Sequence, residues 1–147
     1  MTKGPATTAI IPCGGEKLTS PAPARELYTG QMFTQTLASI EASGDFDRIF
    51  ILSALHGLVE LGQELAPYDL RMGAEGSIDA ESVRAQAEAL EILDDEIYAF
   101  LPTAYFEVLD EALRLEDVFA TPVYEAAAGL GFQRGINAHV GRAELAA

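Results

Sequence analysis

The chain has 147 residues, of which 49% are hydrophobic and 22% charged, and it carries a formal net charge of −14 at pH 7. This length suits one domain with a buried core, and no apolar run approaches the roughly 20 residues that a membrane span requires. The one cysteine excludes an internal disulfide, and with only two histidines it makes no closed zinc site. We therefore expect a cytoplasmic protein without a membrane partner, a metal or a cofactor.

The first half of the chain alternates apolar runs with glycine and proline. A buried strand is predicted over 7–13, followed by a loop with two glycines and two prolines. Pro23 suits the first position of a short helix, and a longer helix follows up to Gly44. A second strand is predicted over 47–53, and an irregular stretch over 54–77.

The second half continues the alternation of helices and strands. We expect a polar helix over 79–93, with Asp79 or Ser77 as its cap, followed by a strand over 97–101. Pro102 would open an amphipathic helix over 102–115. A short strand over 119–124 and a last helix over 130–146 complete the expected elements. This pattern is typical of βαβ units. We predict a single α/β domain over 1–147 with three layers, in which helices flank a short, mostly parallel sheet.

The negative charge is unevenly distributed along the chain. Twelve acidic residues and only two arginines lie between Asp79 and Asp117, whereas the segment from Cys13 to Gly30 has two acidic and two basic residues. Binding to a nucleic-acid backbone depends largely on Lys and Arg, so duplex DNA is a disfavoured partner. A small anionic ligand held by a few local cations remains compatible, and the acidic segment is interpreted as a solvated face.

Two polar, glycine-bearing loops follow the first two predicted strands. They begin at Cys13 and at Ser53. In an open α/β sheet, ligands bind outside the carboxyl ends of the strands. We therefore expect both loops to contribute to one ligand site.

The first loop supplies four candidate ligand-binding residues. Gly14 and Gly15 would let backbone N–H groups approach a phosphate, with Lys17 as its counter-charge, although the Walker spacing is missing; the alternative is an ordinary glycine turn. Cys13 has the position of an activated nucleophile, but a buried cysteine is more often a small apolar filler, and we favour that structural interpretation.

Arg25 and Tyr28 lie three residues apart in the predicted short helix and would share one face. Arg25 suits a bidentate contact to phosphate or carboxylate, and Tyr28 suits stacking on a base. The alternative is that Arg25 pairs with Glu26 or Asp69 and that Tyr28 is buried.

The second loop supplies the candidate catalytic residues His56 and Asp69. His56 has the position of a general base or of a ring that stacks on a nucleobase, and Asp69 would assist a sugar during glycosidic cleavage. The alternatives are a structural histidine and an Asx-turn after Pro67. Further ligand-binding candidates are Ser53, which could instead cap the turn, Gly57 and Tyr68.

Four spaced motifs carry a resemblance to known proteins: Cys13-Gly-Gly-Glu-Lys17, Pro21-Ala-Pro-Ala-Arg-Glu-Leu-Tyr-Thr-Gly30, Leu52-Ser-Ala-Leu-His-Gly-Leu58 and Pro67-Tyr-Asp-Leu-Arg-Met-Gly73. The chain resembles an uncharacterised family of actinobacteria and their phages, and it is similar to the YaaA family of bacterial peroxide-stress proteins. The resemblance covers about the first half of the chain. His56 departs from YaaA, in which an aromatic residue usually precedes the glycine.

The resemblance implies a YaaA-like α/β domain with a pocket for a nucleobase or nucleotide. Similar modules accompany enzymes that make or break N-glycosidic bonds. The first hypothesis is therefore a nucleotide-directed enzyme that cleaves or transfers at such a bond. The alternatives are a binding protein that sequesters a nucleotide, as a phage counter-defence protein would, and a DNA-binding stress protein, which the charge disfavours. The oligomeric state stays open, and a homo-oligomer is compatible with the sequence.

Overall fold

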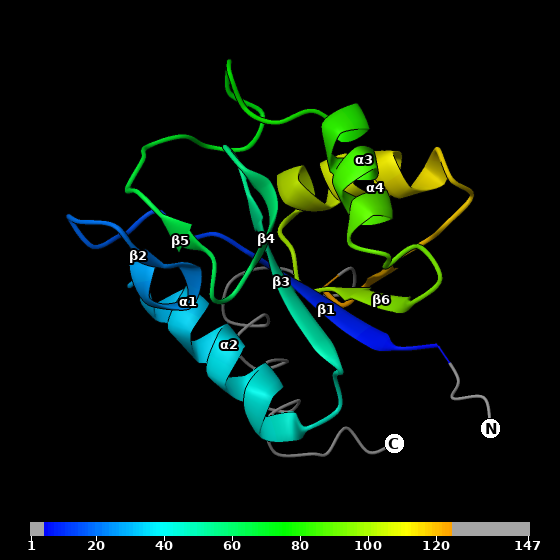
Figure 1. Ribbon diagram of the computed structural model, residues 1–147, viewed down its shortest axis with the longest axis horizontal. Helices are drawn as coiled ribbons and strands as arrows, with labels where there is room; N and C mark the ends of the chain where they lie inside the picture. The colour runs from blue at the N-terminus through cyan, green and yellow to red at the C-terminus, as the bar shows by residue number, and fades with distance from the viewer. Residues whose placement is uncertain (1–4, 125–147) are drawn as a thin grey trace.

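In the computed structural model, which describes residues 5–124, a five-stranded sheet with the order β4-β3-β1-β6-β7 lies between two groups of helices (Figure 1). Parallel neighbours within the sheet are β1 (Thr7–Pro12), β3 (Arg48–Ser53), β6 (Glu96–Ala99) and β7 (Thr121–Pro122). β4 (Gly57–Glu60) is antiparallel to β3 and forms an edge. A second, small sheet pairs β2 (Ala22–Pro23) with β5 (Glu64–Leu65).

Helices cover both faces of the five-stranded sheet (Figure 1). α1 (Ala24–Leu27) and α2 (Gln31–Ser43) pack on one face, and α3 (Ala80–Ala89) and α4 (Thr103–Arg114) on the other. Alternate side chains of β1 point to opposite faces, as strand geometry requires: Ile10 packs with α3 and α4, and Ile11 with α1 and α2. The predicted α/β class with a mostly parallel sheet between two helical layers is confirmed.

The segment over 54–77 is more regular than the sequence predicts. It contains β4 and β5, because the chain turns back after Ser53 through three residues and pairs with β3 as a hairpin. The expectation of an irregular stretch was therefore wrong for these two strands. A four-residue strand that begins at a glycine is too short to give a recognisable alternation of apolar and polar residues.

The predicted helix over 79–93 differs from the observed α3 at its carboxyl end. α3 ends at Ala89 instead of residue 93, because Glu91 adopts a positive φ of 59° and the Ile92 amide donates to the carbonyl of Ala87. This pattern is a Schellman motif, in which glycine is the usual residue. At its other end the predicted cap Asp79 is confirmed, since its side chain accepts from the amide of Ser82.

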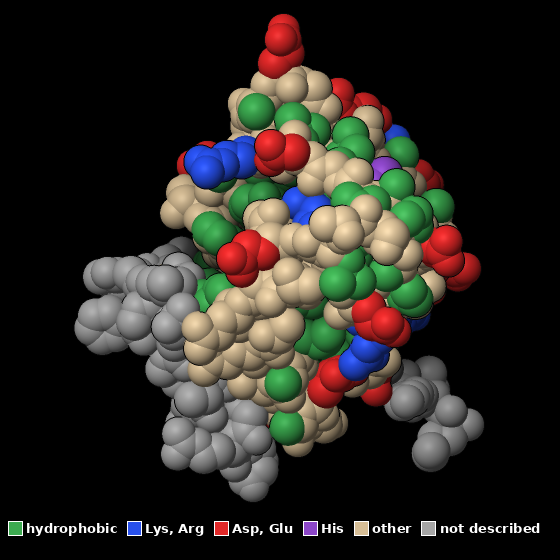
Figure 2. All heavy atoms as spheres, turned by 90° about the vertical axis from the view of Figure 1, so that its left-hand side faces the viewer, with side chains coloured by type: hydrophobic (Ala, Val, Ile, Leu, Met, Phe, Trp, Pro, Cys, Tyr) green, Lys and Arg blue, Asp and Glu red, His purple; other side chains and the backbone are tan. Residues whose placement is uncertain are grey.

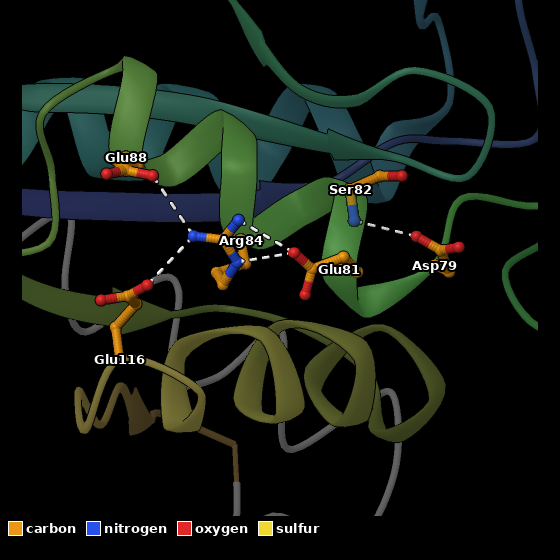
Figure 3. A network of polar contacts seen from close by, with 6 residues as sticks. All are labelled: Asp79, Glu81, Ser82, Arg84, Glu88 and Glu116. Atoms are coloured by element: carbon orange, nitrogen blue, oxygen red, sulfur yellow. Dashed lines mark hydrogen bonds and ion pairs between the residues drawn. The ribbon is translucent and has the colours of Figure 1, made fainter.

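Arg84 connects α3 with the segment that follows α4 (Figure 3). Its guanidinium group pairs with Glu81 and Glu88 on α3 and with Glu116 beyond α4, at distances of 2.9, 3.2 and 3.0 Å. One of the two arginines in the acidic segment is thereby used to neutralise neighbouring carboxylates.

No helix within residues 5–124 is both long and apolar enough to span a membrane. The predicted helix over 130–146 lies outside the described residues.

Candidate functional site

A cavity of about 530 Å³ lies beyond the carboxyl end of β1. Its lining comes from three segments that are distant in sequence: the loop after β1, the segment after β5 and the first turn of α4. These lining residues are Gly14, Gly15, Lys17, Asp69, Leu70, Arg71, Met72, Ala104 and Tyr105. The volume is in the usual range for small-molecule sites. Four of the sequence-predicted site residues, Gly14, Gly15, Lys17 and Asp69, line the cavity.

The cavity collects the basic side chains that have no carboxylate partner among residues 5–124. This part of the chain has six Lys and Arg residues. Four of them form ion pairs with carboxylates, namely Arg25, Arg48, Arg84 and Arg114. The other two, Lys17 and Arg71, both line the cavity. Figure 2 shows a basic side chain inside a hollow of the molecular surface, among hydrophobic side chains.

Behind the cavity, a chain of hydroxyl groups connects the ends of β3, α1 and β5. The Tyr68 hydroxyl lies 2.6 Å from the Ser53 Oγ and 2.6 Å from the Tyr28 hydroxyl. Ser53 is fully buried and Tyr28 nearly so, at 1% exposure. The hairpin turn brings Ser53 into this position, and the residue after α1 brings Tyr28.

The direction of these hydrogen bonds follows from the number of acceptor sites on Ser53. Its Oγ accepts from the amides of Leu55 and His56, at 3.2 and 3.0 Å. A hydroxyl oxygen has two lone pairs, so the Ser53 proton is left to donate to Tyr68. The Tyr68 proton then donates to Tyr28. The predicted turn-capping role of Ser53 and its place in the polar cluster therefore occur together.

Cys13, directly after β1, contacts one of the residues that line the cavity. Its Sγ is 3.4 Å from the hydroxyl of Tyr105, which lines the cavity. Burial raises the pKa of Tyr28, Tyr68 and Tyr105, and the nearby Cys13 sulfur adds to the rise in the pKa of all three. The three phenols are therefore protonated at neutral pH.

Lys17 rests on the rings of two of these tyrosines. Its Nζ lies 4.4 Å from the ring centre of Tyr68 and 5.6 Å from that of Tyr28, which are favourable cation–π distances. The Nζ also donates to the carbonyl of Gly15 at 3.4 Å. This arrangement keeps an ammonium group at the cavity, and no carboxylate within residues 5–124 forms an ion pair with it.

His56 and Gly57 are not part of the cavity lining, and their contacts are with Tyr68 and Gln86. The His56 ring packs edge-on against Tyr68 at 5.4 Å, whereas its carbonyl accepts from the Gln86 Nε2 at 2.7 Å. Gly57 has a φ of 77°, and a side chain there would overlap the Gln86 amide. Neither residue lines the cavity, so the position of both is explained by packing and by the hairpin turn.

Arg25 is not brought to the cavity. Its guanidinium pairs with Glu41 on α2 at 2.8 Å, and both side chains are well exposed. This hydrogen bond also raises the Arg25 pKa. The predicted partners Glu26 and Asp69 are not the ones observed, because α1 is a single turn that directs Arg25 towards α2.

Among the cavity residues that sequence reasoning did not select, Arg71 and Tyr105 are the two with a polar side chain. Arg71 lies inside one of the quoted motifs but resembles any exposed loop arginine. Tyr105 resembles an inward-facing residue of an amphipathic helix. Tyr105 could have been found from its place in the first turn of the helix that follows the third predicted strand. That helix begins at the same edge of the sheet as the loop after the first strand.

Comparison with known proteins identifies one related family. A family model described as a family of unknown function (DUF6884) matches residues 8–133. No curated protein and no solved structure matches the chain. The matched range contains every residue that lines the cavity and every member of the hydroxyl chain. Because the model covers most of its length, the chain belongs to the DUF6884 family of unknown function.

Proposed function

We propose that this protein is nucleotide-directed and binds a small phosphorylated ligand in the cavity beside Lys17. The observation that carries the proposal is the position of the two basic side chains that form no ion pair within residues 5–124. In a chain with a net charge of −14, the two cations without a carboxylate partner within residues 5–124, Lys17 and Arg71, line the same cavity. An anionic ligand would supply the missing partner.

The other walls suit the remaining parts of a nucleotide. Gly14 and Gly15 leave the backbone open to a phosphate, and Tyr105 offers an aromatic ring that a nucleobase would contact. Asp69 is the carboxylate in the lining, and its oxygens would accept hydrogen bonds from sugar hydroxyls. This assignment replaces Arg25 of the sequence-based hypothesis with Arg71.

In the catalytic form of the proposal, Asp69 assists cleavage or transfer at an N-glycosidic bond. A carboxylate beside the sugar would stabilise the positive charge that develops as the bond to the base breaks. The resemblance to modules that accompany N-glycosidic enzymes supports this form.

A second candidate is a binding protein that sequesters a nucleotide without turnover. One observation favours it: His56, the expected partner base, is outside the cavity lining, so Asp69 has no second acid or base of the predicted pair beside it. A binding protein needs only enclosure and satisfied polar contacts, whereas an enzyme needs a placed acid or base.

Incubation with a nucleotide library, followed by mass spectrometry of the products and of the intact protein, distinguishes these forms. Release of free base by the wild type but not by Asp69→Asn would support the enzyme. A nucleotide that binds and is recovered intact would support sequestration. In either form, Lys17→Ala combined with Arg71→Ala is expected to reduce binding at least 100-fold, since each lost charge-assisted hydrogen bond costs about 1.5–3 kcal/mol.

The matched control for that double variant is Arg114→Ala. Arg114 is exposed and pairs with Asp110 on its own helix, away from the cavity. The substitution Arg114→Ala removes one positive charge without changing the cavity lining. Undiminished binding by the double variant, or an equal loss in the control, would refute the assignment of the phosphate to Lys17 and Arg71.

A further inference from the structure

We propose that the ligand is a nucleoside monophosphate, and that the cavity discriminates against nucleoside di- and triphosphates. This inference rests on the proposed function and specifies its ligand class. It comes from the charge that the cavity can compensate, from its size and from the charge of the surrounding protein.

The cavity lining contains few charges. Lys17 and Arg71 are its cations and Asp69 is its carboxylate, which leaves a local excess of one positive charge. A phosphate monoester carries about −1.5 to −2 at neutral pH, close to the charge of the two cations, so that the lining and such a ligand together would carry about −0.5 to −1. A triphosphate carries roughly twice that charge, and most of the addition would have no cation among the lining residues.

The rest of the molecule opposes a larger anion. The formal net charge is −14, and the acidic residues of the described chain are only partly compensated by the four ion-paired arginines. Such a field lowers the local concentration of anions, and it does so more strongly the larger their charge. A monophosphate suffers this repulsion least among the phosphorylated nucleotides.

The size and the lining of the cavity agree with this ligand class. About 530 Å³ is near the middle of the range for small-molecule pockets. Apolar contacts come from Leu70 and Met72, and Tyr105 adds a ring with a protonated hydroxyl. These groups suit one base and one sugar beside one phosphate held by the two cations.

Isothermal titration calorimetry with matched series tests the inference. Each series consists of a nucleoside and its 5′-mono-, di- and triphosphate, for each common base, with and without Mg²⁺. For at least one base, the monophosphate is expected to bind at least tenfold more tightly than the nucleoside and than the triphosphate. Lys17→Ala and Arg71→Ala should each reduce the preference over the nucleoside, and Arg114→Ala should preserve it.

The outcomes separate this inference from the proposed function. Equal or tighter binding of the di- or triphosphate would overturn the monophosphate assignment and leave a nucleotide-binding protein. Binding of the nucleoside as tight as that of every phosphorylated form would overturn the role of the two cations. If no member of any series binds, the proposed function fails as well.

Discussion

Three tyrosine hydroxyls, those of Tyr28, Tyr68 and Tyr105, lie near the sulfur of Cys13 at the carboxyl end of β1. Burial raises the pKa of each above its ordinary value near 10. Below about pH 10 both folded and unfolded chains keep these protons, and their contribution to stability is fully present. Above about pH 10 the unfolded chain releases them first, so the free energy of unfolding falls as the pH rises.

Tyr68→Phe removes the central hydroxyl of the chain from Ser53 to Tyr28. At pH 7 we expect the free energy of unfolding to fall by about 1–3 kcal/mol, because two buried hydroxyl groups lose a partner. Above pH 10 the variant should lose stability less steeply than the wild type. Urea denaturation at pH 7, 9 and 10.5 measures both effects, with Tyr98→Phe, outside this cluster, as the control. An unchanged pH dependence would contradict the argument.

The sequence indicates the members of this site better than their contacts. Cys13, Lys17 and Ser53 were predictable because they lie at or just beyond the ends of apolar runs that become neighbouring parallel strands. The direction of individual side chains depends on turns that leave no periodic signal. Arg25 therefore reaches Glu41 instead of the cavity.

At the level of secondary structure, the elements with a strong periodic pattern were predictable and the short ones were not. β1, β3, α2 and α4 follow apolar spacing closely. β4 is a four-residue strand whose place is fixed by contacts with β3 and with the Gln86 side chain, which come from other parts of the chain. The end of α3 is likewise set by Glu91 in a left-handed conformation, where a glycine would have given the signal.

Gly57→Ala tests how tightly the hairpin packs against α3. Gly57 and Gly44 have similar positive φ values, 77° and 69°, but only Gly57 faces a side chain at close range. Gly44→Ala should cost about 1 kcal/mol through backbone strain alone. Gly57→Ala should cost about 1–3 kcal/mol more, because the added methyl displaces the Gln86 amide. If thermal denaturation showed equal losses of stability for Gly57→Ala and Gly44→Ala, the contact between Gly57 and Gln86 would not contribute to the cost of the substitution.

At the level of the whole molecule, the net charge of −14 determines which partners can approach. Since duplex DNA binding rests on released counterions, we expect no measurable binding of a duplex oligonucleotide between 50 and 200 mM salt. Fluorescence anisotropy with a labelled 20-base-pair duplex checks this, and a known DNA-binding protein serves as the positive control. Binding that weakens steeply with salt would revive the DNA-binding hypothesis.

The contact between Gln86 and β4 also affects which backbone groups are accessible at this edge of the sheet. β4 is an edge strand. The Gln86 side-chain amide accepts from the amide of Leu58 within β4 at 2.8 Å and donates to the carbonyl of His56, directly before β4, at 2.7 Å. One side chain thus takes the place that a neighbouring strand would occupy. An uncovered edge would offer these groups to the backbone of a second molecule, so we expect Gln86 to oppose pairing of β4 with another copy of the chain.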